Sequence, residues 1–281
     1  MKLAHLVLCH VNPEQVKRLV TALYHEDADI YIHVDRKVPI EPFLPLTALP
    51  NVYLVQERVR VYWGGYSIVQ ATLSGFRQIL GSGIRYDFIN LLSGQDYPLK
   101  PATEIHKFLA GNTGNVFINV FPEWNKDAGH DLRLKQYYFA GIKIKGKYTA
   151  ERIARRIKPR VFPEGFVPTG HSQWFTIPAE CAEYILRFLK ENKKIVRLFR
   201  YMWAPDEMVF QSILYNSSYR NAITNENVRY VDWSEKEASP KLLTIADAPL
   251  LMQGGYLFAR KFDISKDSAV LDYIDKTIAN Q

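Results

Sequence analysis

Cysteine is scarce in this sequence, which contains only Cys9 and Cys181. Two cysteines cannot form a disulfide framework, so a fold held by its core and a reducing compartment are expected. Long apolar runs are also missing, since none reaches the ~20 residues that a transmembrane helix requires. The apolar stretch at the N-terminus passes directly into His10 without a small-residue cleavage site, and we interpret it as a first strand. Any membrane association is therefore expected to be peripheral.

Signatures of metal and phosphate-loop sites are missing as well. The seven histidines are scattered and show no zinc-type spacing with cysteine. The only Asp-x-Asp sequence, Asp27-Ala28-Asp29, comes before a predicted strand, which is the wrong end of a sheet for a manganese-nucleotide site. No glycine-rich loop of the Walker or dinucleotide type occurs. These absences predict no metal site and argue against an ATPase or a nicotinamide-dependent enzyme.

The composition is that of a folded domain with an excess of positive charge. Hydrophobic residues make up 47% and charged residues 23% of the 281 residues, enough apolar material for a large core. We expect a single domain over residues 1–281. The formal charge of +7 and the pI near 9.2 favour anionic partners. Such partners include nucleic acid, an anionic membrane surface and a nucleotide diphosphate, and the charge alone does not choose among them.

Short apolar runs alternate with helical patterns along the first half of the chain. This order predicts an α/β fold with a mostly parallel, Rossmann-like sheet flanked by helices. Because ligands of such sheets bind beyond the carboxyl ends of strands, residues 33–35 and 93–97 are expected to face a cleft. The predicted strands are 3–9, 30–34, 51–55 and 86–92, and the predicted helices begin at Pro13, span 67–80 and run from a cap at Thr103 to Gly111.

The second half is less regular at first and then resumes the pattern. Residues 120–168 lack clear periodicity and predict an irregular inserted excursion. A strand over 172–177 and helices over 178–191 and 205–214 are predicted after it. The excursion is basic between residues 143 and 160, where it contains Lys143, Lys145, Lys147, Arg152, Arg155, Arg156, Lys158 and Arg160.

Asp206 and Glu207 follow Pro205, which can occupy the first position of a helix. Acids in a first helical turn complement the helix dipole, and that alone accounts for them. A catalytic interpretation is also open. Neighbouring helical residues point in different directions, so the two acids are poorly placed as the facing carboxylates of a glycosidase. At most one of them is expected to be a reacting base.

Two further segments combine charge or aromatic rings with a strand or a turn. Arg260 and Lys261 lie at the end of a predicted strand, where they either hold a diphosphate or protect a sheet edge from aggregation. Trp63-Gly64-Gly65 joins an indole to a flexible turn, either to stack on a sugar or to plug the core. Trp174, which follows Gln173, likewise either faces a ligand or is buried in the core.

Taken in order, five segments resemble the core-2/I-branching β-1,6-N-acetylglucosaminyltransferases, a family that includes the peptide O-xylosyltransferases. The resemblance extends from the first strand to Asp263, and the ordered set is more specific than any one segment. The segments are Ile32-His33-Val34-Asp35-Arg36-Lys37, Tyr62-Trp63-Gly64-Gly65, Leu91-Leu92-Ser93-Gly94-Gln95-Asp96-Tyr97-Pro98-Leu99, Ala204-Pro205-Asp206-Glu207 and Phe258-Ala259-Arg260-Lys261-Phe262.

The resemblance implies a GT-A-like fold and an inverting transfer of a sugar from a UDP-sugar without a divalent metal. By the family's pattern Glu207 is the general base that takes the acceptor's proton. Arg260 and Lys261 neutralise the leaving diphosphate in place of a metal. The resemblance further suggests that Asp35 meets the uridine and that Trp63, with Gly64 and Gly65, lines the donor sugar pocket.

Asp96 is a candidate site residue, and its carboxylate is expected to cap its own loop or to hydrogen-bond within it. Gln173 stands where the xylosyltransferases carry an acid beside the tryptophan, so a different acceptor is expected. N-acetylglucosamine is the first expectation for the donor sugar and xylose the second. The expected acceptor is a carbohydrate or a glycolipid.

The resemblance suggests a bacterial enzyme in the cytoplasm, with peripheral contact to the inner face of an anionic membrane. Two rivals remain at this point. One is a metal-dependent nucleotide-sugar transferase, and the other is a noncatalytic carbohydrate- or nucleic-acid-binding module that uses the basic segment 143–160. That segment lacks interleaved aromatics for base stacking, so no nucleic-acid partner is expected.

Overall fold

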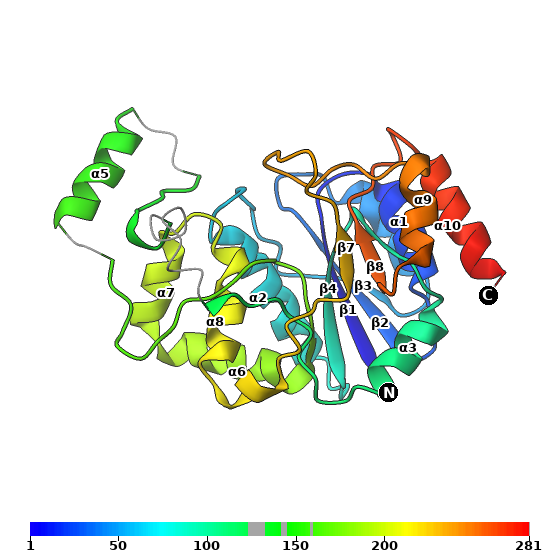
Figure 1. Cartoon of the computed structure of the whole chain (residues 1–281), viewed down its shortest axis with the longest axis horizontal. Helices are drawn as coiled ribbons and strands as arrows, with labels where there is room; N and C mark the ends of the chain where they lie inside the picture. The colour runs from blue at the N-terminus through cyan, green and yellow to red at the C-terminus, as the bar shows by residue number, and fades with distance from the viewer. Residues whose placement is uncertain (123–132, 142–144, 158–159, 281) are drawn as a thin grey trace. The chain divides into compact units, whose positions relative to one another are not determined.

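The computed structural model describes residues 1–122, 133–141, 145–157 and 160–280 of the chain (Figure 1). A single domain was expected from the sequence, and the structure divides the chain into two compact units, each assembled from separate segments. Unit 1 comprises Met1–Gln56, Arg85–Thr113 and Val228–Gln281, and unit 2 comprises Glu57–Ile84 and Gly114–Asn227.

Unit 1 is built on parallel strands. Four of them, β1 (Leu3–Cys9), β2 (Ala28–Val34), β3 (Val52–Leu54) and β4 (Phe88–Ser93), lie in the order β3-β2-β1-β4. Each neighbouring pair is parallel. Nearly every side chain of β1, β2 and β4 is buried, as expected of strands covered on both faces. The α/β class with a mostly parallel sheet is therefore confirmed.

A second, three-stranded sheet of unit 1 carries the C-terminal motif. It has the order β5-β8-β7, where β5 is Asp96–Pro98, β7 is Arg229–Val231 and β8 is Phe258–Arg260. Strand β8 runs antiparallel to β5 and parallel to β7. Its register pairs Asp96 with Arg260, so residues far apart in the sequence become direct neighbours.

Helices complete unit 1. Figure 1 shows α1, α9 and α10 together beside the strands. The helices are α1 (Pro13–Ala22), α3 (Ala102–Ala110), α9 (Ala248–Gln253) and α10 (Ala269–Ala279), with 3-10 turns η1 (Glu41–Ala48) and η5 (Ile245–Asp247). The predicted cap at Thr103 is wrong, because Pro101 is the N-cap of α3 and Thr103 lies inside the helix. The predicted end at Gly111 is confirmed, since Gly111 is the C-cap.

Unit 2 is mainly helical. Its long helices α2 (Ser67–Leu80) and α6 (Ala179–Glu191) pack on each other, and α6 also packs on α7 and α8. Phe76, Phe175 and Phe210 form an aromatic core with ring centroids 5.2–6.2 Å apart. The remaining elements are α5 (Lys147–Ile157), β6 (Thr176–Pro178), α7 (Lys193–Arg200), η3 (Pro205–Glu207), α8 (Val209–Tyr215) and η4 (Ser218–Ala222).

Three expectations for unit 2 need correction. The strand predicted over 172–177 is confined to β6, since only its last residues join the ladder with Phe117. The helix predicted over 205–214 is two elements, η3 and α8, because the backbone at Met208 leaves the helical region. The expected irregular excursion over 120–168 contains the helix α5.

Candidate active site

The carboxyl ends of β1, β2 and β4 bring two predicted motifs to one edge of the unit 1 sheet. The Asp35 amide donates to Cys9 O at 2.9 Å, and the Gly94 amide donates to Leu8 O at 2.9 Å. Asp35 is buried, accepts from the Lys37 amide at 2.8 Å and pairs with the Lys37 ammonium at 3.4 Å. Asp35 and the segment 93–97 therefore flank the end of β1, as the parallel-sheet rule predicts.

The loop between β4 and β5 is fixed by its own hydrogen bonds. Asp96 Oδ2 accepts from the Ser93 amide at 2.9 Å, which confirms the expectation that Asp96 bonds within its loop. Gly94 has no room for a side chain, because a Cβ there would lie 2.9 Å from Cys9 Cβ. Gln15 of α1 donates to the carbonyls of Gly94 and Phe262 at 3.1 and 3.0 Å. The loop, α1 and the end of β8 are thus held together.

Arg260 and Lys261 lie next to this loop. Arg260 Nε is 3.5 Å from Asp96 Oδ1, and the Asp96 side chain is only 1% exposed. Burial raises the pKa of Asp96, and the positive charge of Arg260 opposes that rise. Lys261 donates to Ser239 Oγ at 3.1 Å, and its pKa is lowered by burial and by the adjacent Arg260. Asp96 is therefore placed to orient Arg260, whereas Lys261 has one hydroxyl partner.

Sequence reasoning missed Arg229, which is buried. Its guanidinium donates to Asn90 Oδ1 and to Leu91 O, and it lies 5.2 Å from the ring centre of Phe258. Arg229 acts on Asp96 in the same direction as Arg260, lowering its pKa. Asn90 also bonds the His5 ring, whose pKa burial lowers to about 3. A lone arginine at the start of a short strand gives no signal in a sequence.

In unit 2, Trp63-Gly64-Gly65 packs against the segment that leads to Glu207. The Ala204 amide donates to Gly64 O at 2.8 Å, and the Trp63 and Trp203 rings meet edge to face at 4.7 Å. A Cβ on Gly64 would lie 2.3 Å from the Trp203 ring, and the φ of Gly64 is +68°. Trp63 itself is 66% exposed. The Trp203 ring leaves no room for a side chain at position 64, which accounts for the glycine there. The exposed ring of Trp63 is available to stack on a ligand.

Arg133 organises the turn that bears Glu207. Its guanidinium donates to Trp203 O and Ala204 O at 3.0 Å each and to Glu207 Oε2 at 2.7 Å. The Arg133 side chain is 15% exposed and that of Glu207 is 35% exposed, so the carboxylate is held in place yet reachable. Arg133 is a second residue that sequence reasoning missed, because it lies in the stretch without periodicity.

The neighbouring Asp206 has a different environment. It is buried, and within the described part of the chain its Oδ1 has no hydrogen-bond partner. Burial, followed by the charge of Glu207, raises the pKa of Asp206 to about 7. The two adjacent acids are thus separated by environment, one buried and the other accessible. This agrees with the expectation that at most one of them reacts.

The backbone of Glu207 is packed from the other side by Gly170 and His171. The His171 amide donates to Glu207 O at 3.1 Å, and a Cβ on Gly170 would lie 2.0 Å from that oxygen. Trp174 is 8% exposed, so its indole belongs to the core of unit 2, and Gln173 is half-buried beside it.

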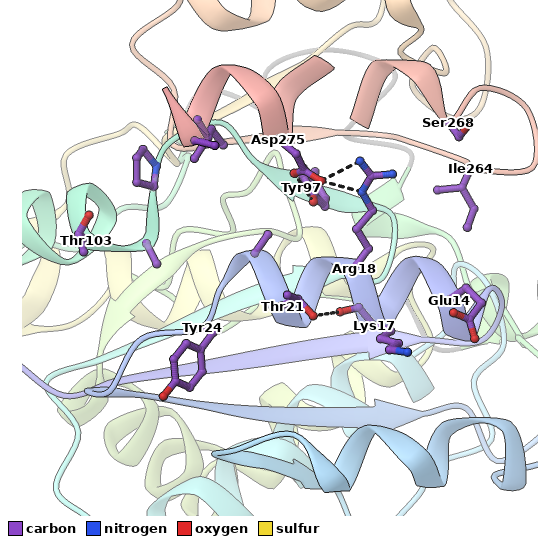
Figure 2. Close-up of a pocket in the computed structure, with 15 residues that line it drawn as sticks. Glu14, Lys17, Arg18, Thr21, Tyr24, Tyr97, Thr103, Ile264, Ser268 and Asp275 are labelled. Carbon is purple, nitrogen blue, oxygen red and sulfur yellow. Dashed lines mark hydrogen bonds and ion pairs between the residues drawn. The ribbon is translucent and has the colours of Figure 1, made fainter. Parts of the chain in front are cut away.

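Two cavities accompany these groups. One of about 430 Å³ in unit 2 is lined by Arg133, Trp203 and five more polar or aromatic residues of 136–151, among them Tyr138 and Glu151. The other, of about 800 Å³, lies in unit 1 between α1, the start of α3 and α10 (Figure 2). Figure 2 shows Arg18 and Tyr97 converging on Asp275 there. No predicted site residue lines the second cavity.

Metal-binding clusters and membrane-spanning helices are both absent from the described residues. Within the described residues, no three His, Cys, Asp or Glu side chains are grouped closely enough to hold a metal ion. Asp29 of the Asp-x-Asp sequence is buried at the amino end of β2 and accepts from Tyr86 at 2.6 Å. No helix in the described ranges is long and apolar enough to span a membrane.

Comparison with known proteins identifies relatives over almost the whole chain. Xylosyltransferase oxt of Drosophila pseudoobscura pseudoobscura is 27% identical over 280 residues, covering 92% of this chain and 31% of its own length. Xylosyltransferase 2 of Rattus norvegicus is 26% identical over 299 residues, covering 98% and 33%. This chain thus spans about a third of the curated relatives that it matches.

Among solved structures, the apo form of mouse Xyloside xylosyltransferase 1 is similar with a TM-score of 0.41 at 11% identity, covering 92% of this chain and 97% of the other. The family described as Branch, Core-2/I-Branching enzyme, matches residues 3–250. That match covers the carboxyl edge of unit 1 and the Glu207 turn of unit 2, and the chain belongs to the Core-2/I-branching enzyme family.

Proposed function

We propose that this protein is an inverting glycosyltransferase that moves a sugar from a UDP-sugar to a hydroxyl of a carbohydrate or glycolipid acceptor. The observation that carries the proposal is the arrangement around Glu207. An accessible carboxylate is held by Arg133 at 2.7 Å, and its turn is joined to the turn of the exposed Trp63 by the Ala204 amide, which donates to Gly64 O. A fixed carboxylate is suited to take a proton from a sugar hydroxyl.

In the proposed reaction, the acceptor oxygen forms a bond to the anomeric carbon while the bond from that carbon to the diphosphate breaks. Glu207 accepts the hydroxyl proton, and UDP leaves with the bonding electron pair. Arg260 and Lys261 stabilise the negative charge that develops on the diphosphate. Their position beside the carboxyl edge of a parallel sheet, where nucleotides bind, supports this role.

Asp35 is proposed to meet the uridine, because it ends β2 at that same edge. Asp96 is proposed to position Arg260 through the ion pair at 3.5 Å and not to touch the substrate. The names of the relatives favour xylose as the donor sugar over the N-acetylglucosamine expected first from the sequence. Metal independence is part of the proposal and rests on the two adjacent cations.

The first test is thermal unfolding with UDP, UDP-xylose and UDP-N-acetylglucosamine in excess chelator. A ligand of the native state stabilises by RT ln(1 + [L]/Kd), or about 2.7 kcal/mol at a hundredfold excess over Kd. We expect a rise in Tm in chelator, ordered by donor preference. Arg260→Ala should abolish most of the rise, whereas Arg85→Ala, an exposed cation of unit 1, should keep it.

Each rival predicts a different result. A rise that appears only with added manganese would favour a metal-dependent nucleotide-sugar transferase. No rise under either condition would favour a noncatalytic binding module. An unchanged rise in Arg260→Ala would remove Arg260 from the diphosphate site.

A further inference from the structure

Helix α5 of unit 2 exposes its two isoleucines, while the alanines on the same face are half-buried. At 100° per residue, Ala150, Ile153, Ala154 and Ile157 share one face of the helix. Ile153 is 48% exposed and Ile157 is 78% exposed. Val161, shortly after the helix, is 68% exposed. Three large aliphatic side chains in and shortly after α5 are thus exposed to solvent.

Of the polar residues of α5, Glu151 is half-buried, whereas Tyr148 and the arginines are exposed. Glu151 accepts from the Phe139 amide at 2.7 Å, and Tyr148 and Glu151 line the 430 Å³ cavity with Trp203. A helix on the surface of a soluble protein normally buries its apolar face and exposes its polar face. In α5 the arginines are exposed as expected, but Ile153 and Ile157 are exposed as well. Exposed large aliphatic side chains indicate that this side of the helix has a partner of its own.

Arg160 anchors the chain after α5. It is buried, its guanidinium donates to Gln136 O and Leu198 O, and it lies 5.7 Å from the ring centre of Tyr137. Arg160 is therefore a structural residue and does not contribute to a basic surface over 143–160. These contacts tie the segment after α5 to α7 and to residues 136–137.

The exposed charges around the apolar face are cationic. Arg156 borders the face, Arg152 and Arg155 lie further round the helix, and Lys145 precedes it, all exposed. The same sign dominates unit 2, which contains 21 Lys and Arg against 12 Asp and Glu, whereas unit 1 contains 15 against 17. The excess positive charge of the chain therefore resides in the unit that exposes the apolar helix face.

We propose that α5 docks on an anionic lipid bilayer, with Ile153 and Ile157 inserted at the level of the headgroups and the arginines beside the lipid phosphates. Aliphatic side chains flanked by cations are the features of interfacial helices. Nucleic acid is the weaker alternative, because Ile and Val provide no stacking surface for bases. A second copy is also disfavoured, since two arginine-rich helices would repel each other.

The test is co-sedimentation of the full chain with phosphatidylcholine vesicles that contain or lack phosphatidylglycerol. We expect binding to the anionic vesicles only, and weaker binding as salt rises because surface charges are screened. The variant Ile153→Ser/Ile157→Ser should bind at least about tenfold more weakly. Its control, Ile245→Ser/Leu250→Ser, removes apolar residues of unit 1 that are 44% and 58% exposed and should bind normally.

Charge reversal provides a second, matched pair. Arg155→Glu/Arg156→Glu should lose binding, whereas Lys236→Glu/Lys266→Glu, which changes the net charge equally on exposed residues of unit 1, should retain most of it. Equal binding to neutral and anionic vesicles, or normal binding by the Ile153→Ser/Ile157→Ser variant, would overturn the proposal. Loss of a dimer in sedimentation velocity for that variant would identify a second copy as the partner instead.

Discussion

Asp206 and Glu207 are adjacent in sequence but have different surroundings. Pro205 starts the turn, and Arg133 then binds Glu207 and two carbonyls of the same turn. Glu207 remains accessible at 35% side-chain exposure, while Asp206 is buried with a partnerless oxygen among the described residues. Glu207, the accessible acid, is therefore the candidate base. Asp206, the buried acid, is expected to affect the stability of the fold.

Replacing Glu207 with glutamine should separate catalysis from binding. The amide cannot accept a proton, so turnover should fall by ~10² or more if Glu207 is the general base. The fold and UDP affinity should be preserved, because UDP is proposed to bind in unit 1. Initial rates and UDP-induced shifts in Tm measure the two effects. Near-normal turnover would show that Glu207 is not the base.

The raised pKa of Asp206 predicts a pH-dependent stability. Between the ordinary pKa near 4 and about 7, the folded protein holds a proton that the unfolded chain has released, so stability falls as pH rises through this window. Asp206→Asn removes that dependence. Its stability relative to the original protein should increase from pH 4 to pH 8, by no more than about 4 kcal/mol.

Urea unfolding of both proteins at pH 5 and pH 8 measures this difference. A difference that stays constant with pH would show that Asp206 is ionised throughout. A difference that shrinks with rising pH would have the opposite sign from that of a raised pKa and would contradict the prediction.

At the scale of elements, the turn before α8 depends on close backbone contact. A Cβ on Gly170 would lie 2.0 Å from Glu207 O, and the His171 amide bonds that same oxygen. Gly170→Ala should therefore shift η3 and lower both stability and turnover, with a stability loss of about 1–3 kcal/mol for the strained contact.

The matched control is Gly255→Ala, where a Cβ would meet nothing within 4 Å and the φ is not positive. Thermal unfolding and initial rates of both variants provide the comparison. Equal effects of the two substitutions would mean that the contact with Glu207 has no special importance.

The sequence predicted some elements well because their signal is local. The apolar runs of β1, β2 and β4 predicted buried strands, and their order predicted parallel pairing. The break at Met208 and the shortness of β6 were missed, since both depend on contacts with distant segments. Helix α5 was missed because its amphipathic pattern lies within a stretch whose charge suggested a loop.

At the scale of the whole molecule, the composition gives the net charge but not its distribution between the two units. The net charge of +7 is visible in the composition, but its concentration in unit 2 appears only when the segments of each unit are known. Each unit is discontinuous in sequence, so no local composition shift marks its boundary. The exposed isoleucines of α5 therefore belong to the unit that carries the excess positive charge.

Part of the candidate site was likewise visible in the sequence. The ordered motifs around Asp35, Trp63, Asp96, Glu207 and Arg260 were sufficient to recognise the family, because their residue types and order persist in a linear pattern. The role of Asp96 as a partner of Arg260 was not visible, since it depends on the antiparallel register of β5 and β8.

The sequence by itself therefore determined the α/β class and the family, because short-range patterns and motif order suffice for these, and it supplied the candidate site residues. Only the tertiary structure decided that Arg133 holds Glu207, that Arg229 and Arg260 flank Asp96, and that α5 turns its isoleucines outward. Burial and ion pairing are properties of contacts between residues distant in sequence, and a linear pattern does not contain them.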